Sequence, residues 1–273
     1  MRQSKNSVKA VTFDLWETLF FERDGWHQKR MNTRCQSLAQ ALNKLGEKID
    51  AERLASAFTA MTQWLENVWE NNREVTHHDQ IQFIIKTATK NTISPKDKWF
   101  NQLSKAYVSA IYEVPPLLNP DTHAVLQWLK SKNKRIGLIC NTGLTPGFAL
   151  RGFLAYIGIA DYFDLMLFSD EVGIRKPSPE IFQIAARKLQ TKSCNIVHVG
   201  DNLRGDVWGA QNAGLKAILL ETMTGRDLIA ESNPASLVAI SRKMGDLKKE
   251  QIVPDRTVTS LADTIKAIQE LEA

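Results

Sequence analysis

Strand-like and helix-like segments alternate along the second half of this chain, and that order restricts the fold to few arrangements. Parallel strands are joined by crossover helices, so a β–α–β–α order predicts an α/β fold with a doubly wound parallel sheet and helices on both faces. The runs that favour strands lie at 135–140, 164–168, 195–199 and 216–220, and the segments that favour helices lie near 121–132, 147–157, 179–190 and 206–213.

One further strand-like run, residues 8–13, stands apart from this region and ends at Asp14. A helical block separates it from the alternating region, which begins after Pro115-Pro116. We therefore predict a core formed by residues 1–21 and 116–273, with an α-helical domain of residues 22–115 inserted after the first strand.

Four amphipathic helices are predicted within the inserted block. Gly46 is expected to close the first helix, and Ser94-Pro95 is expected to begin the fourth. The apolar residues that recur at helical spacing in the first helix are Met31, Cys35, Leu38, Leu42 and Leu45.

The C-terminal region gives weaker signals. Residues 222–253 are polar and irregular, with one helix favoured around 235–246, and their role is not predicted. A short strand near 256–259 and a helix at 261–271 are expected to complete the fold.

Composition argues against several functional classes. The chain of 273 residues has 35 Lys and Arg against 30 Asp and Glu, and the resulting charge of +5 is spread along it, which does not favour a nucleic-acid or membrane partner. Three scattered cysteines do not favour a disulfide framework or a zinc site. Without a signal-peptide pattern or a long apolar segment, we expect a soluble cytoplasmic protein.

Polar residues follow the predicted strands at the positions where each strand ends. Asp14, Asn141, Asp201 and Asp206 do so, and Lys176 lies in the segment after the third strand of the alternating region. Each alone has an ordinary explanation as a turn, a cap or a solvated charge. Three carboxylates and one lysine at the same sheet edge would be costly without a balancing cation or ligand, and Mg²⁺ is the cation that such oxygen ligands suit.

Four segments in this order make the chain resemble the haloacid dehalogenase superfamily of hydrolases, most of which are phosphatases. They are FDLWETL (13–19), LICNTG (138–143), EVGIRKPSPEIF (171–182) and VGDNLRGD (199–206). The inserted block resembles the helical cap of one branch of the superfamily. The resemblance implies a Rossmann-like core and Mg²⁺-dependent hydrolysis of small phosphomonoesters or acyl phosphates through an aspartyl phosphate.

The resemblance also implies a role for each residue. Asp14 would be the nucleophile, and Lys176 would hold it and offset negative charge. Asp14, Asp201, Asp206 and the backbone carbonyl of Trp16 would bind Mg²⁺. Substrate would contact Cys140 and Asn141, with neighbouring backbone N–H groups, and Trp16. The expected partner is a small phosphorylated or anionic metabolite, and the oligomeric state is not predicted.

Two positions depart from the superfamily pattern. Trp16 stands where its phosphatases carry an Asp that protonates the leaving oxygen, so we expect slow turnover or a preference for good leaving groups. Glu17 is the nearest acid that could substitute. Cys140 stands where Ser or Thr is usual; its thiol is a weaker donor, and it is as readily explained as a small buried residue.

Trp16 also leaves two alternatives open. Dehalogenases of the superfamily carry an aromatic residue at this position and attack carbon without a metal, although they lack the acid that this chain keeps as Asp201. A non-catalytic binding protein that has lost its general acid is the third hypothesis.

Several residues outside the four segments are weaker candidates. Trp26 and His27, at the start of the insertion, could touch substrate, and His198 is expected to pack within a strand. Three arginines also lie near the start of the insertion, which the resemblance places at the entrance to the active site. Arg23, Arg30 and Arg34 could receive an anionic substrate there.

Overall fold

A six-stranded parallel sheet forms the centre of the computed structural model, which describes residues 7–23, 25–90, 97–221, 248 and 251–273. The order β5-β4-β1-β6-β7-β8 corresponds to 3-2-1-4-5-6 along the chain, the Rossmann order, and it confirms the predicted α/β fold. The order reverses between β1 and β6, which therefore flank the crevice where such folds bind ligands. The strands are β1 (Ala10–Phe13), β4 (Arg135–Cys140), β5 (Leu165–Phe168), β6 (Ile196–Gly200), β7 (Lys216–Leu220) and β8 (Arg256–Val258).

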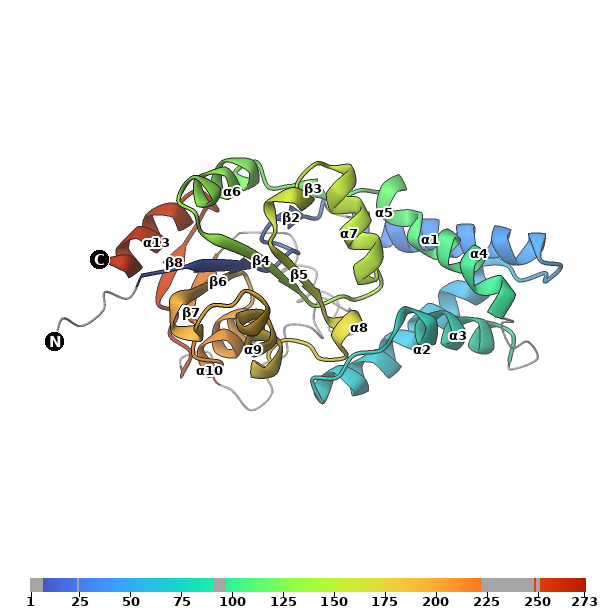
Figure 1. Ribbon diagram of the computed structural model, residues 1–273. Coiled ribbons are helices and arrows are strands. Elements are labelled where there is room, and N and C mark those ends of the chain that lie inside the picture. The colour runs from blue at the N-terminus through green and yellow to red at the C-terminus, as the bar shows by residue number, and fades with distance from the viewer. Residues whose placement is uncertain (1–6, 24, 91–96, 222–247, 249–250) are drawn as a thin grey trace.

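Helices cover both faces of this sheet (Figure 1). One hydrophobic cluster joins α6, α7 and α13 to one face, and a second joins α9, α10 and the π-helical segment η3 to the other. The helical elements of this part are α6 (Thr122–Ser131), α7 (Gly147–Tyr156), η1 (Ala160–Tyr162), α8 (Ser169–Val172), α9 (Pro179–Lys188), η2 (Ser193–Asn195), η3 (Leu203–Trp208), α10 (Gly209–Asn212) and α13 (Thr264–Glu272).

Helices α1 to α4, between β1 and α6, extend away from the sheet and pack around a third hydrophobic cluster (Figure 1). The chain leaves the sheet through β2 and returns through β3, and these two short strands pair antiparallel at the base of the helical part. They lie close to the predicted boundaries, although the division into two domains remains a prediction. The elements are β2 (Phe20–Phe21), α1 (Trp26–Lys44), α2 (Ala51–Glu70), α3 (His77–Ala88), α4 (Asp97–Val108), α5 (Ala110–Glu113) and β3 (Leu117–Leu118).

Local sequence signals explain where several helices begin and end. The Asp50 side chain accepts a hydrogen bond from the backbone of Arg53 at the start of α2, and Thr76 and Asp79 form a capping box at the start of α3. Gly46 follows α1 with a φ of 91°, a left-handed conformation that glycine adopts without strain, so its predicted role is confirmed.

Two parts of the chain differ from the sequence expectation or escape it. The helix expected at 206–213 begins earlier, as η3, and continues into α10. The predicted Ser94-Pro95 start of α4 and the predicted helix at 235–246 lie outside the described residues.

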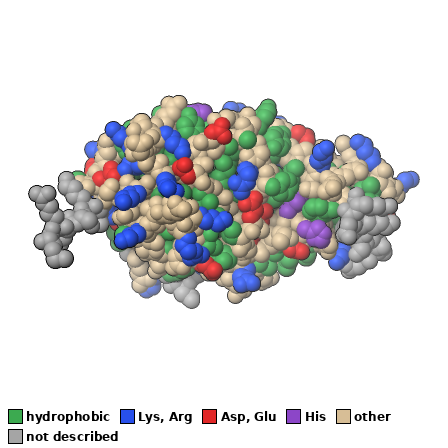
Figure 2. Space-filling model, in the orientation of Figure 1, with side chains coloured by type: hydrophobic (Ala, Val, Ile, Leu, Met, Phe, Trp, Pro, Cys, Tyr) green, Lys and Arg blue, Asp and Glu red, His purple; other side chains and the backbone are tan. Residues whose placement is uncertain are grey.

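Charge on the outer surface is mixed. Lys and Arg side chains are scattered over the face seen in Figure 2, with Asp and Glu among them. No helix within the described ranges is both long and apolar enough to cross a membrane.

Buried His77 makes the helical part sensitive to acid. Its Nε2 lies 2.9 Å from Ser104 Oγ, and its ring packs against Tyr107 with the ring centroids 4.9 Å apart. Burial lowers the pKa of His77 to about 4, helped by the charge of Arg34. The folded protein thus keeps this ring neutral, whereas the unfolded chain takes up a proton near pH 6.5.

We expect His77 to contribute stability that is fully present above pH 6.5 and is lost as the pH falls towards 4. At pH 5 the loss is about 2 kcal/mol, at about 1.4 kcal/mol per pH unit. Urea unfolding at pH 7 and pH 5 measures it as the difference between wild type and His77→Gln. His123→Gln, at an exposed position, is the matched control. Equal pH dependence in all three proteins would contradict this expectation.

Candidate active site

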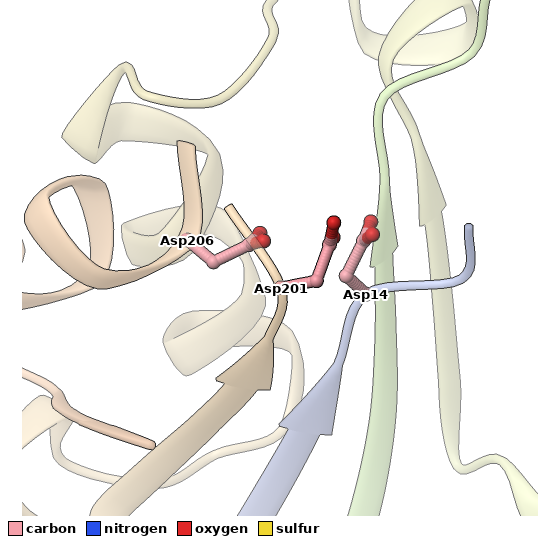
Figure 3. Close-up of side chains that lie close together, drawn as sticks. All are labelled: Asp14, Asp201 and Asp206. Atoms are coloured by element: carbon pink, nitrogen blue, oxygen red, sulfur yellow. The ribbon is translucent and has the colours of Figure 1, made fainter. Parts of the chain in front are cut away.

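Three carboxylates converge at the carboxyl ends of β1 and β6, on either side of the point where strand order reverses (Figure 3). Asp14 directly follows β1, Asp201 directly follows β6, and Asp206 lies in η3. One oxygen from each carboxylate can be chosen so that all three lie within 4.8 Å of one another. The sequence prediction that these three residues meet is therefore correct.

The backbone around β6 fixes Asp206 in this position. The backbone N–H of Asn202 donates to Asp206 Oδ2 at 2.9 Å. A Cβ atom at Gly200 would overlap the Asp206 carboxylate, so glycine is needed where the strand ends. The π-helical turn thereby directs Asp206 back over the end of its own strand.

Lys176 joins two of the three acids. Its Nζ donates to Asp14 Oδ1 and to Asp206 Oδ1, both at 2.6 Å, and its side chain is almost fully buried. His198 also contacts Asp206: its Nε2 lies 3.1 Å from Asp206 Oδ1, while its Nδ1 lies 2.9 Å from Thr12 Oγ1. His198 is thus a packed residue, as expected, but one that supports the site.

These contacts shift the pKa of each group. Burial favours the neutral form of Asp206, but the Lys176 charge and the hydrogen bonds from His198 and Lys176 outweigh it and hold the pKa of Asp206 well below its usual range. Burial lowers the pKa of Lys176 more than any other single cause, yet the two carboxylates together raise that pKa above its ordinary value. Burial, with the charge of Asp206, raises the pKa of Asp14 despite Lys176. Lys176 therefore stays protonated.

The donor set suits a hard divalent cation. With all groups ionised, three carboxylates and one ammonium leave a net charge of −2 in a largely buried place. Carboxylate oxygens at this density are the ligands that Mg²⁺ takes in proteins. The residues present therefore fit such an ion.

A cavity of about 150 Å³ opens beside these residues, and its lining tests the predicted substrate contacts. Trp16 and Asn141 line it. The Asn141 side chain, however, is bonded to the backbone of Lys176, accepting from its N–H at 2.8 Å and donating to its carbonyl at 2.9 Å. Asn141 thus holds the lysine segment in place.

Three of the sequence expectations fit the structure poorly. Cys140 is fully buried in the core and does not line the cavity, which agrees with its interpretation as a small packed residue. Glu17, the suggested substitute acid, is fully buried and does not line the cavity either. The backbone N–H of Thr142, beside Asn141, already donates to Ser169 Oγ at 2.8 Å.

A buried ion pair behind Lys176 was not predicted from the sequence. Glu74, between α2 and α3, accepts hydrogen bonds from Arg175 Nη1 and Ser169 Oγ at 2.7 Å each and from Trp69 Nε1 at 2.6 Å. The Arg175 guanidinium also stacks over the Trp69 ring at 3.8 Å. The helical insertion therefore contacts the segment that carries Lys176.

Some of the residues predicted near the start of the insertion line the cavity, and others do not. Arg30, Arg34 and His27 line the cavity, whereas Trp26 and the exposed Arg23 do not. The four-residue spacing of Arg30 and Arg34, which places both on one face of α1, was the signal that could have separated them from Arg23.

Comparison with known proteins identifies a matching family and similar folds. A family model of haloacid dehalogenase-like hydrolases matches residues 8–214, and an HAD-hydrolase-like model matches residues 173–264. Among solved structures, a 2-haloacid dehalogenase from Pseudomonas syringae pv. Tomato aligns with a TM-score of 0.63 at 19% identity, covering 97% of this chain and 99% of that one. An HAD phosphatase from Thermococcus onnurineus aligns with a TM-score of 0.59 at 21% identity, covering 95% and 97%. Both likenesses concern the fold.

Similar sequences include named phosphatases. The ribulose-1,5-bisphosphate 5-phosphatase of Halopiger xanaduensis is 27% identical over 83% of this chain and 90% of its own length. The glyceraldehyde 3-phosphate phosphatase of Methanothermobacter thermautotrophicus is 39% identical over 38% of this chain and 44% of its own length. The phosphoglycolate phosphatase of Yersinia pseudotuberculosis is 33% identical, covering 50% and 58%.

We expect Glu74→Gln to destabilise the protein by about 3–5 kcal/mol, because it leaves the buried Arg175 charge without its partner. The double variant Glu74→Gln/Arg175→Met should recover much of this loss, since it removes both charges. Urea unfolding of the two single variants and the double variant gives the coupling energy.

Glu171→Gln is the matched control, because Glu171 pairs with Arg151 at the surface, where both side chains are substantially exposed. It should change the free energy of unfolding by less than about 1 kcal/mol. If Glu74→Gln cost no more than Glu171→Gln, the buried pair would contribute nothing beyond a surface pair.

Proposed function

The chain belongs to the haloacid dehalogenase-like hydrolases, and from this we propose that it is a phosphatase acting on small phosphomonoesters or acyl phosphates through a phosphorylated Asp14. The observation that carries the proposal is the cluster of three acids at the sheet edge, Asp14, Asp201 and Asp206, the first and last of which are paired with Lys176. The named phosphatases among similar sequences support the same reaction class.

Asp14 would react in two steps. A carboxylate oxygen attacks phosphorus, so that a bond forms between Asp14 and phosphorus while the bond from phosphorus to the leaving oxygen breaks. Water then attacks phosphorus, the bond to Asp14 breaks, and inorganic phosphate leaves with both protons of that water, which restores the Asp14 carboxylate. Lys176, held protonated, orients Asp14 through Oδ1 and offsets the negative charge that the phosphoryl group brings.

Asp14, Asp201 and Asp206 would hold Mg²⁺, with the backbone carbonyl of Trp16 as the further ligand that the family resemblance implies, and the bound ion would supply positive charge to the phosphoryl oxygens. Asp201 also argues against the dehalogenase alternative, because a further carboxylate at this point would repel a haloacid substrate. The small cavity favours small substrates.

Trp16 determines which leaving groups are tolerated. It lines the cavity, packs against Phe20 with the ring centroids 5.8 Å apart, and has no acidic proton to donate. Position 16 therefore cannot protonate the departing oxygen, which favours leaving groups that depart as anions. Aryl and acyl phosphates, whose leaving groups are stable anions, are the favoured substrates.

We expect the protein to release phosphate from p-nitrophenyl phosphate in the presence of Mg²⁺ and to lose this activity in EDTA. Asp14→Asn should lower kcat by about 10³-fold or more, because the nucleophile is removed. Asp161→Asn, at an exposed position, is the control and should leave kcat unchanged.

The same preparations also test the alternatives. Chloride release from 2-chloropropionate in EDTA, without phosphate release from any phosphate ester, would establish the dehalogenase alternative and refute the proposal. If neither product formed and Asp14→Asn still bound phosphate esters in calorimetry, the protein would be a binding protein.

A series of aryl and alkyl phosphates tests the role of Trp16. We expect kcat/KM of the wild type to fall steeply as the pKa of the leaving group rises. Trp16→Asp should raise kcat/KM for alkyl phosphates by about 10²-fold, the usual size of general acid catalysis. Trp16→Phe keeps an aromatic ring without an acid and should leave the slope unchanged. A flat profile in the wild type would mean that another residue donates the proton.

A further inference from the structure

Arg34 is a buried cation at the cavity that forms no ion pair with any of the described residues. It lies on α1 with only 2% of its surface exposed. Its Nε donates to the backbone carbonyl of Tyr107 at 3.2 Å, its Nη2 donates to Thr145 Oγ1 at 3.1 Å, and the guanidinium stacks over the Tyr107 ring at 4.8 Å. These contacts fix the guanidinium from several sides, and all of them are neutral.

Arg34 differs from the other buried Lys and Arg side chains of the described residues in forming no ion pair. Within the described part of the chain, no carboxylate lies within 4.0 Å of Arg34. A buried charge without a counter-charge is costly, and burial correspondingly lowers the pKa of Arg34. The other buried Lys and Arg side chains in that part, Arg30, Lys134, Arg175 and Lys176, each form an ion pair with Glu or Asp.

Arg30 lies one helical turn away and also lines the cavity. Its Nη1 donates to Glu22 Oε1 at 2.6 Å, whereas its buried Nη2 has no hydrogen-bond partner in the described residues. Glu22 neutralises Arg30 and would repel an anion placed directly beside it. Glu22 also interacts with Arg34 electrostatically, but without an ion pair. The buried positive charge of this wall that has no directly bonded acid is therefore at Arg34, with Arg30 Nη2 as an additional donor.

We propose that Arg34 binds a second anionic group of the substrate, a carboxylate or a second phosphate, while the reacting phosphoryl group lies at Asp14. This inference rests on the proposed function and narrows it to small substrates with two anionic ends. Arg34, Asp14 and Lys176 line the same cavity. The fixed planar fork of Arg34 suits the oxygens of carboxylate and phosphate alike.

Matched substrate pairs test the proposal and separate the two anions. Phosphoglycolate is compared with 2-hydroxyethyl phosphate, and propane-1,3-diol bisphosphate with 3-hydroxypropyl phosphate. We expect kcat/KM of the wild type to be at least about 10-fold higher for the anionic member of one pair. The pair that shows this preference identifies the second anion as a carboxylate or a phosphate.

Arg34→Gln should reduce the preferred ratio by about 10-fold or more, the usual effect of losing a hydrogen bond to a charged group. Its kcat/KM for the neutral members should change by less than about 3-fold. Arg34→Lys should keep part of the preference, because it keeps the charge without the fork. Arg23→Gln removes an exposed arginine that stacks on Trp26 outside the cavity, and it should leave the ratio unchanged.

Thermal unfolding without ligand supplies a second measurement. Because Arg34→Gln removes an uncompensated buried charge, we expect its Tm to be equal to or above that of the wild type. A lower Tm together with an unchanged substrate ratio would make Arg34 a structural residue and overturn the proposal. Wild-type turnover with no preference in either pair would also overturn it, while leaving the phosphatase function standing.

Failure of the phosphatase function itself has a different signature. If the wild type releases phosphate from none of the four compounds, all of which have alkyl leaving groups, their binding is measured by calorimetry, whether or not p-nitrophenyl phosphate is hydrolysed. Tighter binding of an anionic member by about 10-fold, lost in Arg34→Gln, would support the anion site, and p-nitrophenyl phosphate hydrolysis decides separately whether the protein is a phosphatase. Equal binding of all four compounds would refute the site as well.

Discussion

Lys176 is the residue on which the arrangement of the site depends. Its ammonium group is bonded at 2.6 Å to carboxylates from two different strand ends, Asp14 after β1 and Asp206 in the turn after β6. Without this shared cation, the buried carboxylates would repel one another, and their pKa values would rise. Asn141 holds the backbone of Lys176 through both ends of its amide, so a third strand end fixes the lysine. Positioning of the nucleophile thus depends on contacts among three strands.

The helical insertion is connected to this cluster through the residue next to Lys176. Arg175 pairs with Glu74 and stacks on Trp69, both of which belong to the insertion, and its backbone N–H donates to the carbonyl of Asn72. Glu74 also accepts from Ser169, whose hydroxyl receives the backbone N–H of Thr142. One buried carboxylate therefore links the insertion to two core segments beside the cavity. A change in the position of the insertion would disturb the lysine segment directly.

The sheet and the acidic cluster could be predicted because both follow from local patterns. Alternating strands and helices require parallel strands, and parallel strands bring their carboxyl ends to one edge. Asp14 and Asp201 were therefore expected at one sheet edge, although the strand order that makes β1 and β6 neighbours comes from the structure. The order of the segments, with a helical block after the first strand, likewise indicated the insertion. These inferences needed no knowledge of how any side chain packs.

The residues that escaped prediction depend on contacts between distant segments. Glu74 lies in a short connection without periodicity, and its partner Arg175 is 101 positions away in the sequence. Asn141 was expected to face substrate, but its amide satisfies the backbone of Lys176, a need that becomes visible only in three dimensions. Arg34 could be named from the sequence as a candidate, but its burial and its neutral partners could not be predicted. A sequence can show that an arginine lies on a helix, but only the packed structure shows that it is buried at a cavity beside neutral partners. Because such a charge is costly to the folded protein, the cost itself becomes an argument for a ligand that balances it.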